Sequence, residues 1–284
     1  MRIGISDDAY ITRYGLKEGA KKMLSHGFDC IDYQPLSRTV GSVMTLPEGK
    51  FERFLRKTAE EYAAEGLTVW QAHGPWDYPA VYDTSRELRE KRFGHMEKAV
   101  RGAAYIGTKY IAIHNIMPLG DRDTDPQLTW DVNVDFFGRL AAVAKEYNVV
   151  ICLENMPFGG QIFARPAETL KLVKALDSEN VRMCLDTGHA AVFGISPAEA
   201  MREIGTDYIK ILHVHDNDGK HDFHWNPYTG WIDWDDFSKS LRDTGFDGCV
   251  NLETTVQYLE SGLQRDCREL WLANKTKKIA GIDF

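Results

Sequence analysis

The sequence predicts a single α/β domain, a (β/α)8 TIM barrel that spans residues 1–284. Eight short runs rich in valine, isoleucine and leucine alternate with segments of helical periodicity. The runs recur about every 35 residues, the repeat expected of a barrel of about 250 residues. No GxGxxG motif follows the first run, which disfavours the competing doubly wound sheet, and no linker divides the chain.

The eight runs are short enough to be strands, and the segments between them carry helix signals. The predicted strands are residues 2–6, 28–33, 67–73, 109–114, 148–154, 180–186, 208–215 and 248–253. Apolar residues spaced three or four apart, such as Phe51, Leu55 and Tyr62, predict an amphipathic helix between two of these runs. Glycines such as Gly27 and Gly66 follow helical stretches, where a left-handed residue commonly ends a helix.

Composition narrows the class of protein. With 43% hydrophobic and 27% charged residues, the chain is typical of a folded enzyme or binding domain. No uncharged apolar stretch is long enough to span a membrane, and no signal-peptide core opens the chain, so we expect a cytoplasmic protein without a membrane partner. Five cysteines without a CxxC pair predict reduced thiols. The net charge of −8 disfavours a nucleic acid partner.

The carboxyl ends of the predicted strands carry side chains that can bind metal. The active site of such a barrel lies at these ends. Six consecutive strands end at His73, His114, Glu154, Asp186, His215 and Glu253. One such residue is usually a loop-entry or capping group, but six in succession favour a metal site. We predict one divalent ion, Mn, Zn, Co or Mg, held by Glu154, Asp186, His215 and Glu253.

Residues next to these ends add polar and aromatic groups. His189 follows Asp186 by three residues and is expected to face the same cavity. Asp222 and His224, in the loop after residue 215, form either a further ligand pair or a loop salt link. Trp76 offers a flat face for a sugar ring, or packs a loop. One layer lower, side chains that support the ligands are expected at Gln71, His213 and Asn251.

Several short motifs resemble those of a known superfamily. The motifs are HGPW at 73–76, LEN at 153–155, LDTGH at 185–189, HDNDGK at 215–220, DFH at 222–224 and LET at 252–254. Together they resemble the xylose-isomerase-like TIM-barrel superfamily, which includes sugar phosphate isomerases and epimerases and the family-2 apurinic (AP) endonucleases. The resemblance extends over essentially the whole chain.

The two branches imply different metal sites. In the epimerase branch, the resemblance implies one ion on the four predicted ligands, with both glutamates as acid and base. In the endonuclease branch it implies three zinc ions, whose additional ligands map onto His73, His114, His189, Asp222 and His224. The loop from 215 to 222 is shorter than the endonuclease loop and lacks its Ser-Arg pair. His221 stands where ketose 3-epimerases have an arginine.

The predicted function is that of a metal-dependent isomerase or epimerase of a sugar or cyclitol. Glu154 and Glu253 would transfer the proton through an enediolate held by the metal, and His189 would stabilise the developing oxygen charge. The predicted substrate-binding residues are His73, His114, Trp76, His189, His221, Asp222 and His224. A keto-sugar lyase or dehydratase and a zinc phosphodiesterase remain alternatives. The expected substrate is an unphosphorylated sugar or keto-sugar, and the chain leaves open whether the protein is a homo-oligomer.

Overall fold

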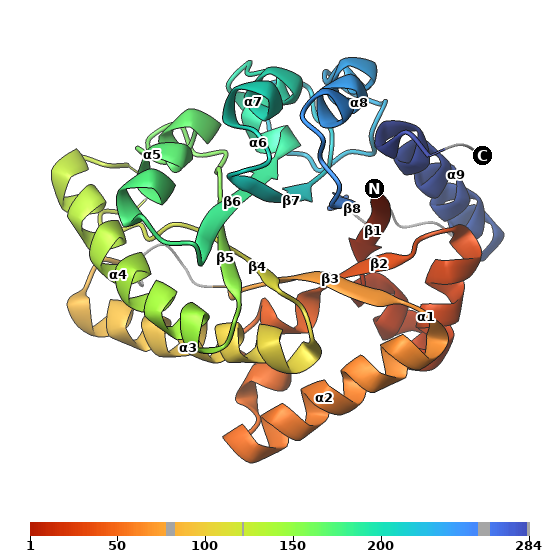
Figure 1. Ribbon diagram of the computed structural model, residues 1–284, viewed down its shortest axis with the longest axis horizontal. Coiled ribbons are helices and arrows are strands. Elements are labelled where there is room, and N and C mark those ends of the chain that lie inside the picture. Colours follow the sequence, from red (N-terminus) through yellow and green to blue (C-terminus); the bar gives the residue numbers. More distant parts are fainter. Residues whose placement is uncertain (78–82, 121, 255–261, 283–284) are drawn as a thin grey trace.

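The strands of the computed structural model form one parallel sheet that curls into a barrel (Figure 1). The structure describes residues 1–77, 83–120, 122–254 and 262–282. The strands are β1 (Arg2–Ser6), β2 (Cys30–Tyr33), β3 (Thr68–His73), β4 (Tyr110–Ile113), β5 (Val150–Glu154), β6 (Val181–Asp186), β7 (Ile209–His213) and β8 (Cys249–Leu252). They are ordered β7-β6-β5-β4-β3-β2-β1-β8. The predicted (β/α)8 barrel is therefore confirmed.

The barrel closes between β7 and β8 through a residue just beyond β7. The amide of Val214 donates to the carbonyl of Asn251 at 2.9 Å, and the amide of Glu253 donates to the carbonyl of Val214 at 3.1 Å. This parallel bridge brings the end of β8 beside the end of β7. The side chains that follow the two strands therefore share one side of the barrel mouth.

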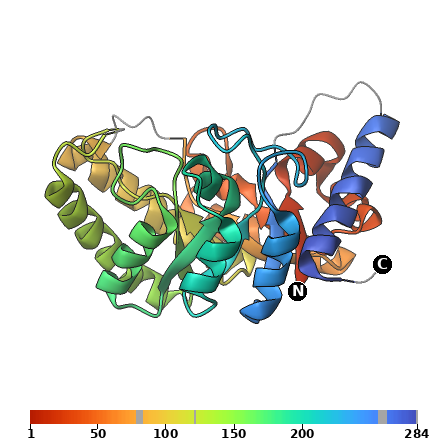
Figure 2. The same cartoon turned by 90° about the horizontal axis from the view of Figure 1, so that it is seen from above.

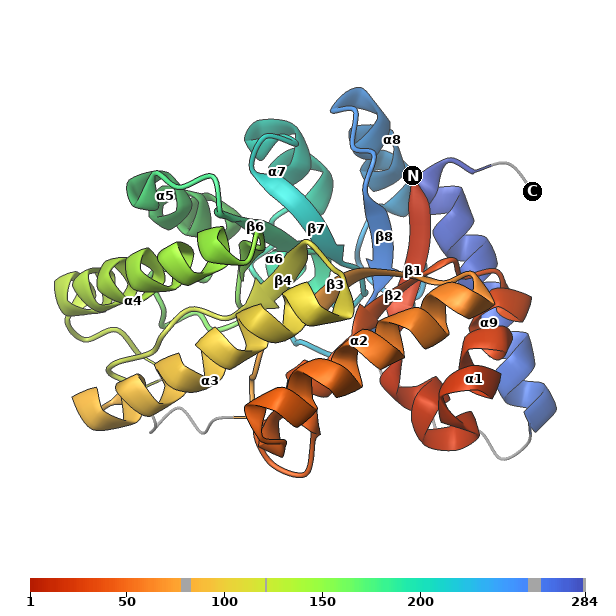
Figure 3. The same cartoon turned by 60° about the horizontal axis from the view of Figure 1, so that its bottom comes forward.

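Helices surround the barrel and bury the outer face of the sheet (Figures 1 and 3). They are α1 (Asp8–His26), α2 (Glu48–Glu65), α3 (Arg86–Ile106), α4 (Pro126–Glu146), α5 (Pro166–Leu176), α6 (Thr187–Val192), α7 (Pro197–Ile204), α8 (Trp234–Asp243) and α9 (Gly262–Ala280), with short 3-10 turns at Gln34–Leu36 and Val43–Thr45. The main core, which includes Phe51 and Leu153, lies between helices and sheet. No described helix is long and apolar enough to cross a membrane.

Small apolar side chains fill the lower interior of the barrel. They are Ala112, Val150, Cys152, Cys184 and Ile211. Because strand side chains alternate, polar residues above this layer point into the mouth. In the side view of Figure 2 the N terminus lies at the lower edge and the long loop between β7 and α8 at the upper edge. The mouth is thus built from the segments that follow the strands.

Two irregularities shift the strand register. In β3, Trp70 is an extra residue, so that Asp32 of β2 lies opposite Gln71. In β7, Lys210 is an extra residue, so that Asp186 of β6 lies opposite His213. Each bulge changes which side chains stand at the same height in the barrel.

Candidate metal centre

A cavity of about 330 Å³ opens at the carboxyl ends of the strands. It is lined by His73, Trp76, His114, Glu154, Met156, Pro157, Phe158, His189, Asp222, His224 and Glu253. One wall carries imidazoles and carboxylates, and the other carries the apolar side chains that follow β3 and β5. The cavity therefore offers both metal ligands and a surface for a less polar part of a substrate.

Three carboxylates and one imidazole meet beneath the cavity. Ligand atoms of Glu154, Asp186, His213 and Glu253, named here the inner set, all lie within 4.8 Å of one another. Nδ1 of His213 is 2.9 Å from Oε1 of Glu154 and 3.3 Å from Oε2 of Glu253. Glu154, Asp186 and His213 are the last residues of their strands, and Glu253 is the first residue beyond β8. This arrangement can surround one divalent ion.

A pair of histidines approaches the same glutamate from β3 and β4. Nε2 of His114 lies 3.3 Å and Nε2 of His73 lies 3.6 Å from Oε2 of Glu154. Burial disfavours charge on Glu154, but the imidazoles of His213, His114 and His73 outweigh it and hold its pKa well below the usual value. Glu154 is therefore an anion shared between the inner set and the histidine pair.

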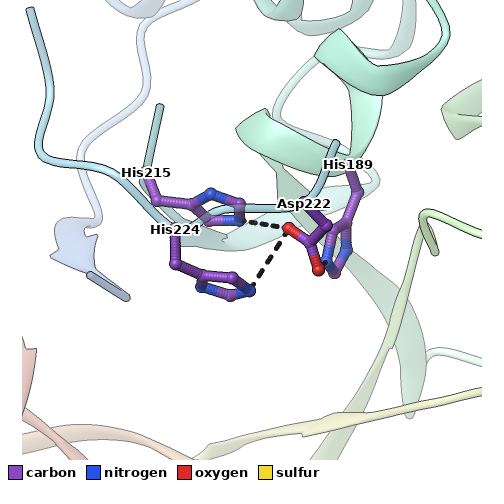
Figure 4. Close-up of side chains that lie close together, drawn as sticks. All are labelled: His189, His215, Asp222 and His224. Carbon is purple, nitrogen blue, oxygen red and sulfur yellow. Dashed lines mark hydrogen bonds and ion pairs between the residues drawn. The ribbon is translucent and has the colours of Figure 1, made fainter. Parts of the chain in front are cut away.

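A second group lies beyond the strand ends, on α6, just after β7 and on the β7–α8 loop (Figure 4). Its members, named here the outer set, are His189, His215, Asp222 and His224. The rings of His215 and His224 stack with their centroids 3.8 Å apart. Asp222 reaches Nε2 of His189 and Nε2 of His224, each at 3.3 Å. Oδ1 of Asp222 also lies 3.8 Å from Nε2 of His215, so this carboxylate contacts all three imidazoles of the outer set.

The predicted ligand set differs from the geometry at one position. His215 was predicted to join the three carboxylates, but the structure places His213 among them and His215 in the outer set. In the register between β6 and β7, Asp186 lies opposite His213, the last residue of β7, and His215 follows two residues beyond the end of the strand. His215 still contacts Asp186, with Nε2 3.0 Å from Oδ1. It therefore lies between the two sets.

Two glycines make the approach of these loops possible. A Cβ atom on Gly188 would lie 2.0 Å from Cε1 of His215, so the turn after β6 needs glycine. A Cβ atom on Gly230 would lie 2.1 Å from the carbonyl oxygen of Asn217. Both positions are places of close approach rather than of positive φ.

A buried carboxylate shapes the loop that carries Asp222 and His224. Asp216 accepts hydrogen bonds from the backbone amides of Asn217, Thr229, Gly230 and Ile232 and from the indole of Trp234. The backbone of Asp216 also pairs with that of Trp225 at 2.8 and 2.9 Å. These contacts fold the loop back over β7, which brings its metal-capable side chains to the cavity.

His189 is the most strongly perturbed histidine of the outer set. Burial lowers its tendency to be charged, but Asp186 and Asp222 outweigh burial and raise its pKa to about 10. Its backbone amide donates to Oδ1 of Asp186 at 2.6 Å. In the protein alone, His189 is therefore a cationic donor at neutral pH.

Two predicted substrate-binding residues lie at the edge of the site or outside it. Trp76 lines the cavity and is 44% exposed, with the guanidinium of Arg38 5.1 Å from its ring centroid. His221 does not reach the cavity: its exposed ring lies beside Asp218, with Nδ1 2.8 Å from Oδ2. The side chain of Asp218 also accepts the amide of His221, which turns this residue outward.

Sequence reasoning missed Asp32 and the apolar wall. Asp32 is fully buried on β2, where it meets Gln71 and His213. The signal that could have revealed Asp32 was a single carboxylate within the otherwise strand-like run CIDY. Phe158, which lines the cavity beyond β5, carried no signal that distinguished it from a loop aromatic residue.

The chemistry of the donors fits a divalent cation. The buried polar atoms that have no hydrogen-bond partner among the described residues include four at this site: Oδ1 of Asp32, Oε2 of Glu154, Nε2 of His213 and Nδ1 of His215. Buried polar atoms normally have partners, and a cation would satisfy the free oxygen of Glu154. Mixed imidazole and carboxylate ligands suit zinc, manganese or cobalt.

Comparison with known proteins shows the family to which the chain belongs. A family model described as xylose isomerase-like TIM barrel matches residues 20–274. A probable endonuclease 4 from Metamycoplasma arthritidis is 25% identical over 82% of this chain and 86% of its own length. A D-psicose 3-epimerase from Ruminiclostridium cellulolyticum is 26% identical over 68% of this chain and 65% of its own length. A solved structure of the IOLI protein with a bound zinc atom is similar in fold, with a TM-score of 0.74, 18% identity, and coverage of 99% of this chain and 98% of that chain.

Proposed function

Since the chain belongs to the xylose isomerase-like TIM-barrel family, we propose that it is a divalent-metal-dependent isomerase or epimerase of a sugar or cyclitol. The observation that carries the proposal is the pair Glu154 and Glu253. Both line one cavity, and both approach the same nitrogen of His213. A proton transfer between two faces or two neighbouring carbons needs two such bases.

The inner set would hold the ion. Glu154, Asp186 and Glu253 supply three anionic ligands, and two of these carboxylates also line the cavity. The neutral ligand is either His213 or the predicted ligand His215, whose Nε2 lies 3.0 Å from Oδ1 of Asp186. When bound, a divalent ion withdraws electrons from a substrate carbonyl and makes the neighbouring C–H more acidic. The zinc atom bound in the IOLI structure, a protein of similar fold, supports a metal in the present protein.

The two glutamates differ in exposure, which assigns them different tasks. The side chain of Glu154 is 1% exposed and that of Glu253 is 23% exposed. Glu154, which is an anion, would therefore take the substrate proton on the closed side, whereas Glu253 would return a proton that it exchanges with solvent. His189 donates a hydrogen bond to the oxygen on which charge develops.

The cavity also favours an uncharged substrate. None of the described residues that line it is a lysine or arginine. The D-psicose 3-epimerase among the relatives acts on a small sugar, as its name says, and this supports the same class for the present chain. Trp76 and Phe158 would contact the apolar face of the ring.

Hydrogen exchange tests the proposal. With a panel of keto-sugars in D2O and metal restored, the wild-type protein should incorporate deuterium at a carbon next to the carbonyl. Glu154→Gln and Glu253→Gln should each lower exchange by about 10²–10⁴-fold. Exchange that persists in both variants would contradict the pair. An unsaturated product instead of an epimer would assign the same site to a lyase or dehydratase.

A second candidate, a metal-dependent phosphoesterase, is favoured by the number of ligands. The histidine pair and the outer set add six side chains to the inner set, more than one ion uses. Sites with several metal ions commonly catalyse phosphoryl displacement. The probable endonuclease 4 among the relatives supports this candidate.

Metal counting and one variant distinguish the two candidates. Incision of abasic duplex DNA with close to three ions per chain would favour the phosphoesterase, and one ion without incision would favour the isomerase. Asp222→Asn disrupts only the outer set. It should leave sugar exchange within about 10-fold of wild type if the inner ion suffices, and should abolish phosphoester cleavage if all sets are needed.

A further inference from the structure

A second cavity, of about 300 Å³, opens outside the barrel between α1 and α2, which are neighbours around the sheet (Figures 1 and 3). Apolar side chains form most of its wall, among them Ile11, Val43, Leu46 and Phe54. It shares no described lining residue with the cavity that holds the candidate metal ligands. A cavity of about 150 Å³ is large enough for benzene, so this one has room for a six-membered ring with a short substituent.

An interruption in α1 shapes one wall of this cavity. Gly15 has φ 72° and ψ 171°, which is not a helical conformation, and Ile11 and Leu16 lie on either side of it. In a continuous helix, residues five apart point about 140° away from each other. Because the helix breaks at Gly15, both side chains line the cavity instead. The positive φ at this position favours glycine.

Two buried hydroxyl groups on the wall have no partner among the described residues. Tyr33, the last residue of β2, is 2% exposed, and Thr58 on α2 is 4% exposed. Neither hydroxyl forms a hydrogen bond with a described residue, and neither is among the atoms that the protein encloses completely. Both residues line the cavity, so these hydroxyls face its open volume. Buried polar groups normally have partners, and these two are therefore available to the polar group of a ligand.

The cavity offers no charged group that a ligand could contact directly. None of the described residues that line it is a lysine, arginine or histidine. The carboxyl group on its wall belongs to Asp7, which is 0% exposed and accepts from the Gln34 amide at 3.0 Å and the Tyr62 hydroxyl at 2.7 Å. A charged ligand would therefore lose its hydration without gaining a counter-ion, which is costly.

We propose that this cavity binds a small uncharged organic molecule, an alcohol or a ketone with an apolar body, whose oxygen forms a hydrogen bond with the hydroxyl of Tyr33 or Thr58. The apolar wall matches the body of such a molecule. Either hydroxyl can donate to a ligand oxygen or accept from a ligand hydroxyl. The inference goes beyond the proposed function, because it depends neither on the metal site nor on the reaction proposed there.

Methyl NMR of the full chain locates the site, with benzyl alcohol as the probe. In protein with labelled isoleucine, leucine and methionine methyl groups, benzyl alcohol should shift the signals of Ile11, Leu16 and Leu46 in a saturable way. The signal of Met156, which lines the cavity at the barrel mouth, should not follow the same curve. Shifts confined to Met156, or no saturable shift at all, would overturn the proposal.

Charged analogues of the probe test the chemical class of the ligand. Benzylamine is cationic and benzoate is anionic at neutral pH, and both have nearly the shape of benzyl alcohol. Each should bind to the wild-type protein at least about 10-fold more weakly than benzyl alcohol, as measured from the same methyl signals. Equal or tighter binding of either analogue would overturn the assignment to an uncharged ligand.

Two conservative variants test the hydrogen bond. Tyr33→Phe and Thr58→Val each remove one hydroxyl and keep the shape of the side chain. At least one of them should weaken binding of benzyl alcohol by about 2–10-fold, the effect of one hydrogen bond, and leave binding of ethylbenzene, which lacks the oxygen, unchanged. The matched control is Tyr147→Phe at the end of α4, outside this cavity, which should bind both ligands as wild type does.

The comparison of the two ligands decides the outcome. Unchanged binding of benzyl alcohol in both cavity variants would overturn the hydrogen bond, and so would an equal loss for benzyl alcohol and ethylbenzene, which would show a purely structural role. If one variant does not fold, the other decides. The result for the charged analogues comes from the wild-type protein and needs no variant.

Discussion

The inner and outer sets offer similar ligand types but are positioned by different parts of the fold. Glu154 and Asp186 end strands, and His213 ends β7 beside them. Asp222 and His224 lie on the β7–α8 loop, where their side chains are 28% and 27% exposed, whereas His189 and His215 are buried. The inner set is therefore fixed by backbone pairing between strands, whereas two members of the outer set depend on one loop.

This difference indicates which part of the site is more sensitive to substitutions in the surrounding structure. Hydrogen bonds along a barrel resist local movement, but a loop keeps its shape only through its own contacts. The loop here relies on Asp216, which binds backbone amides from Asn217 to Ile232. A perturbation of this loop should displace Asp222 and His224 first and leave the inner set in place.

Asp186 is where the two sets meet, and its replacement should have the largest effect. Its carboxylate faces the inner set and contacts His189 and His215 of the outer set. Asp186→Asn should weaken Co²⁺ binding at the inner set by at least about 100-fold, since an anionic ligand contributes several kcal/mol. It should also lower the pKa of His189, which Asp186 helps to raise, as followed by NMR of the metal-free protein. The exposed Asp135→Asn should change neither quantity.

Asp7 sharpens the comparison, because it is as buried as Glu154 and Asp186 but has no histidine beside it among the contacts that shift its pKa. Burial raises its pKa from 3.8 to about 7, against hydrogen bonds from the Gln34 amide and the Tyr62 hydroxyl. The folded protein thus holds this proton more tightly than the unfolded chain. The resulting stability is present below about pH 4 and is lost as the pH rises to about 7.

Replacing Asp7 should remove this dependence. The free energy of unfolding of Asp7→Asn, relative to wild type, should rise by up to about 4 kcal/mol between pH 4 and pH 7. Urea unfolding at several pH values measures it. Parallel curves for the two proteins would show that Asp7 is ionised throughout.

Gly230→Ala should distort the β7–α8 loop without disturbing the strands, and so affect the outer set but not the inner set. Its Cβ would lie 2.1 Å from the carbonyl oxygen of Asn217 and 2.5 Å from Oδ1 of Asp216. The expected loss of stability is about 1–3 kcal/mol, with fewer ions per chain but the inner ion retained. Thermal unfolding and elemental analysis measure these effects. Gly138→Ala, on α4 with nothing near its Cβ, is the matched control and should be neutral or stabilising.

Trp76→Ala should have the smallest effect, because it touches neither set. Loss of one aromatic contact should raise KM by about 2- to 10-fold with kcat unchanged. Trp271, which is exposed on α9, provides the control substitution. A fall in kcat at constant KM would contradict this expectation, because it would show that Trp76 stabilises the transition state rather than only binding the substrate.

The fold and most of the candidate ligands could be predicted from the sequence, but the position of each ligand along the barrel axis could not. Strand ends such as His73, Glu154 and Asp186 were read correctly from apolar runs, because period-two burial marks strands well. The predicted strand ran to His215, two residues beyond the end of β7, so the sequence alone did not show that His213 lies level with Asp186. The outward turn of His221 depends on Asp218, a contact that spacing alone does not reveal.

The anchoring of the β7–α8 loop has a consequence for how this protein can diversify. Asp216 grips main-chain amides, so the loop keeps its path whatever most of its side chains are. Positions at the tip, such as Lys220 and Phe223, are then open to replacement without disturbing the scaffold. Substitutions at such positions can change which substrate is preferred while the candidate ligands at the strand ends stay in place.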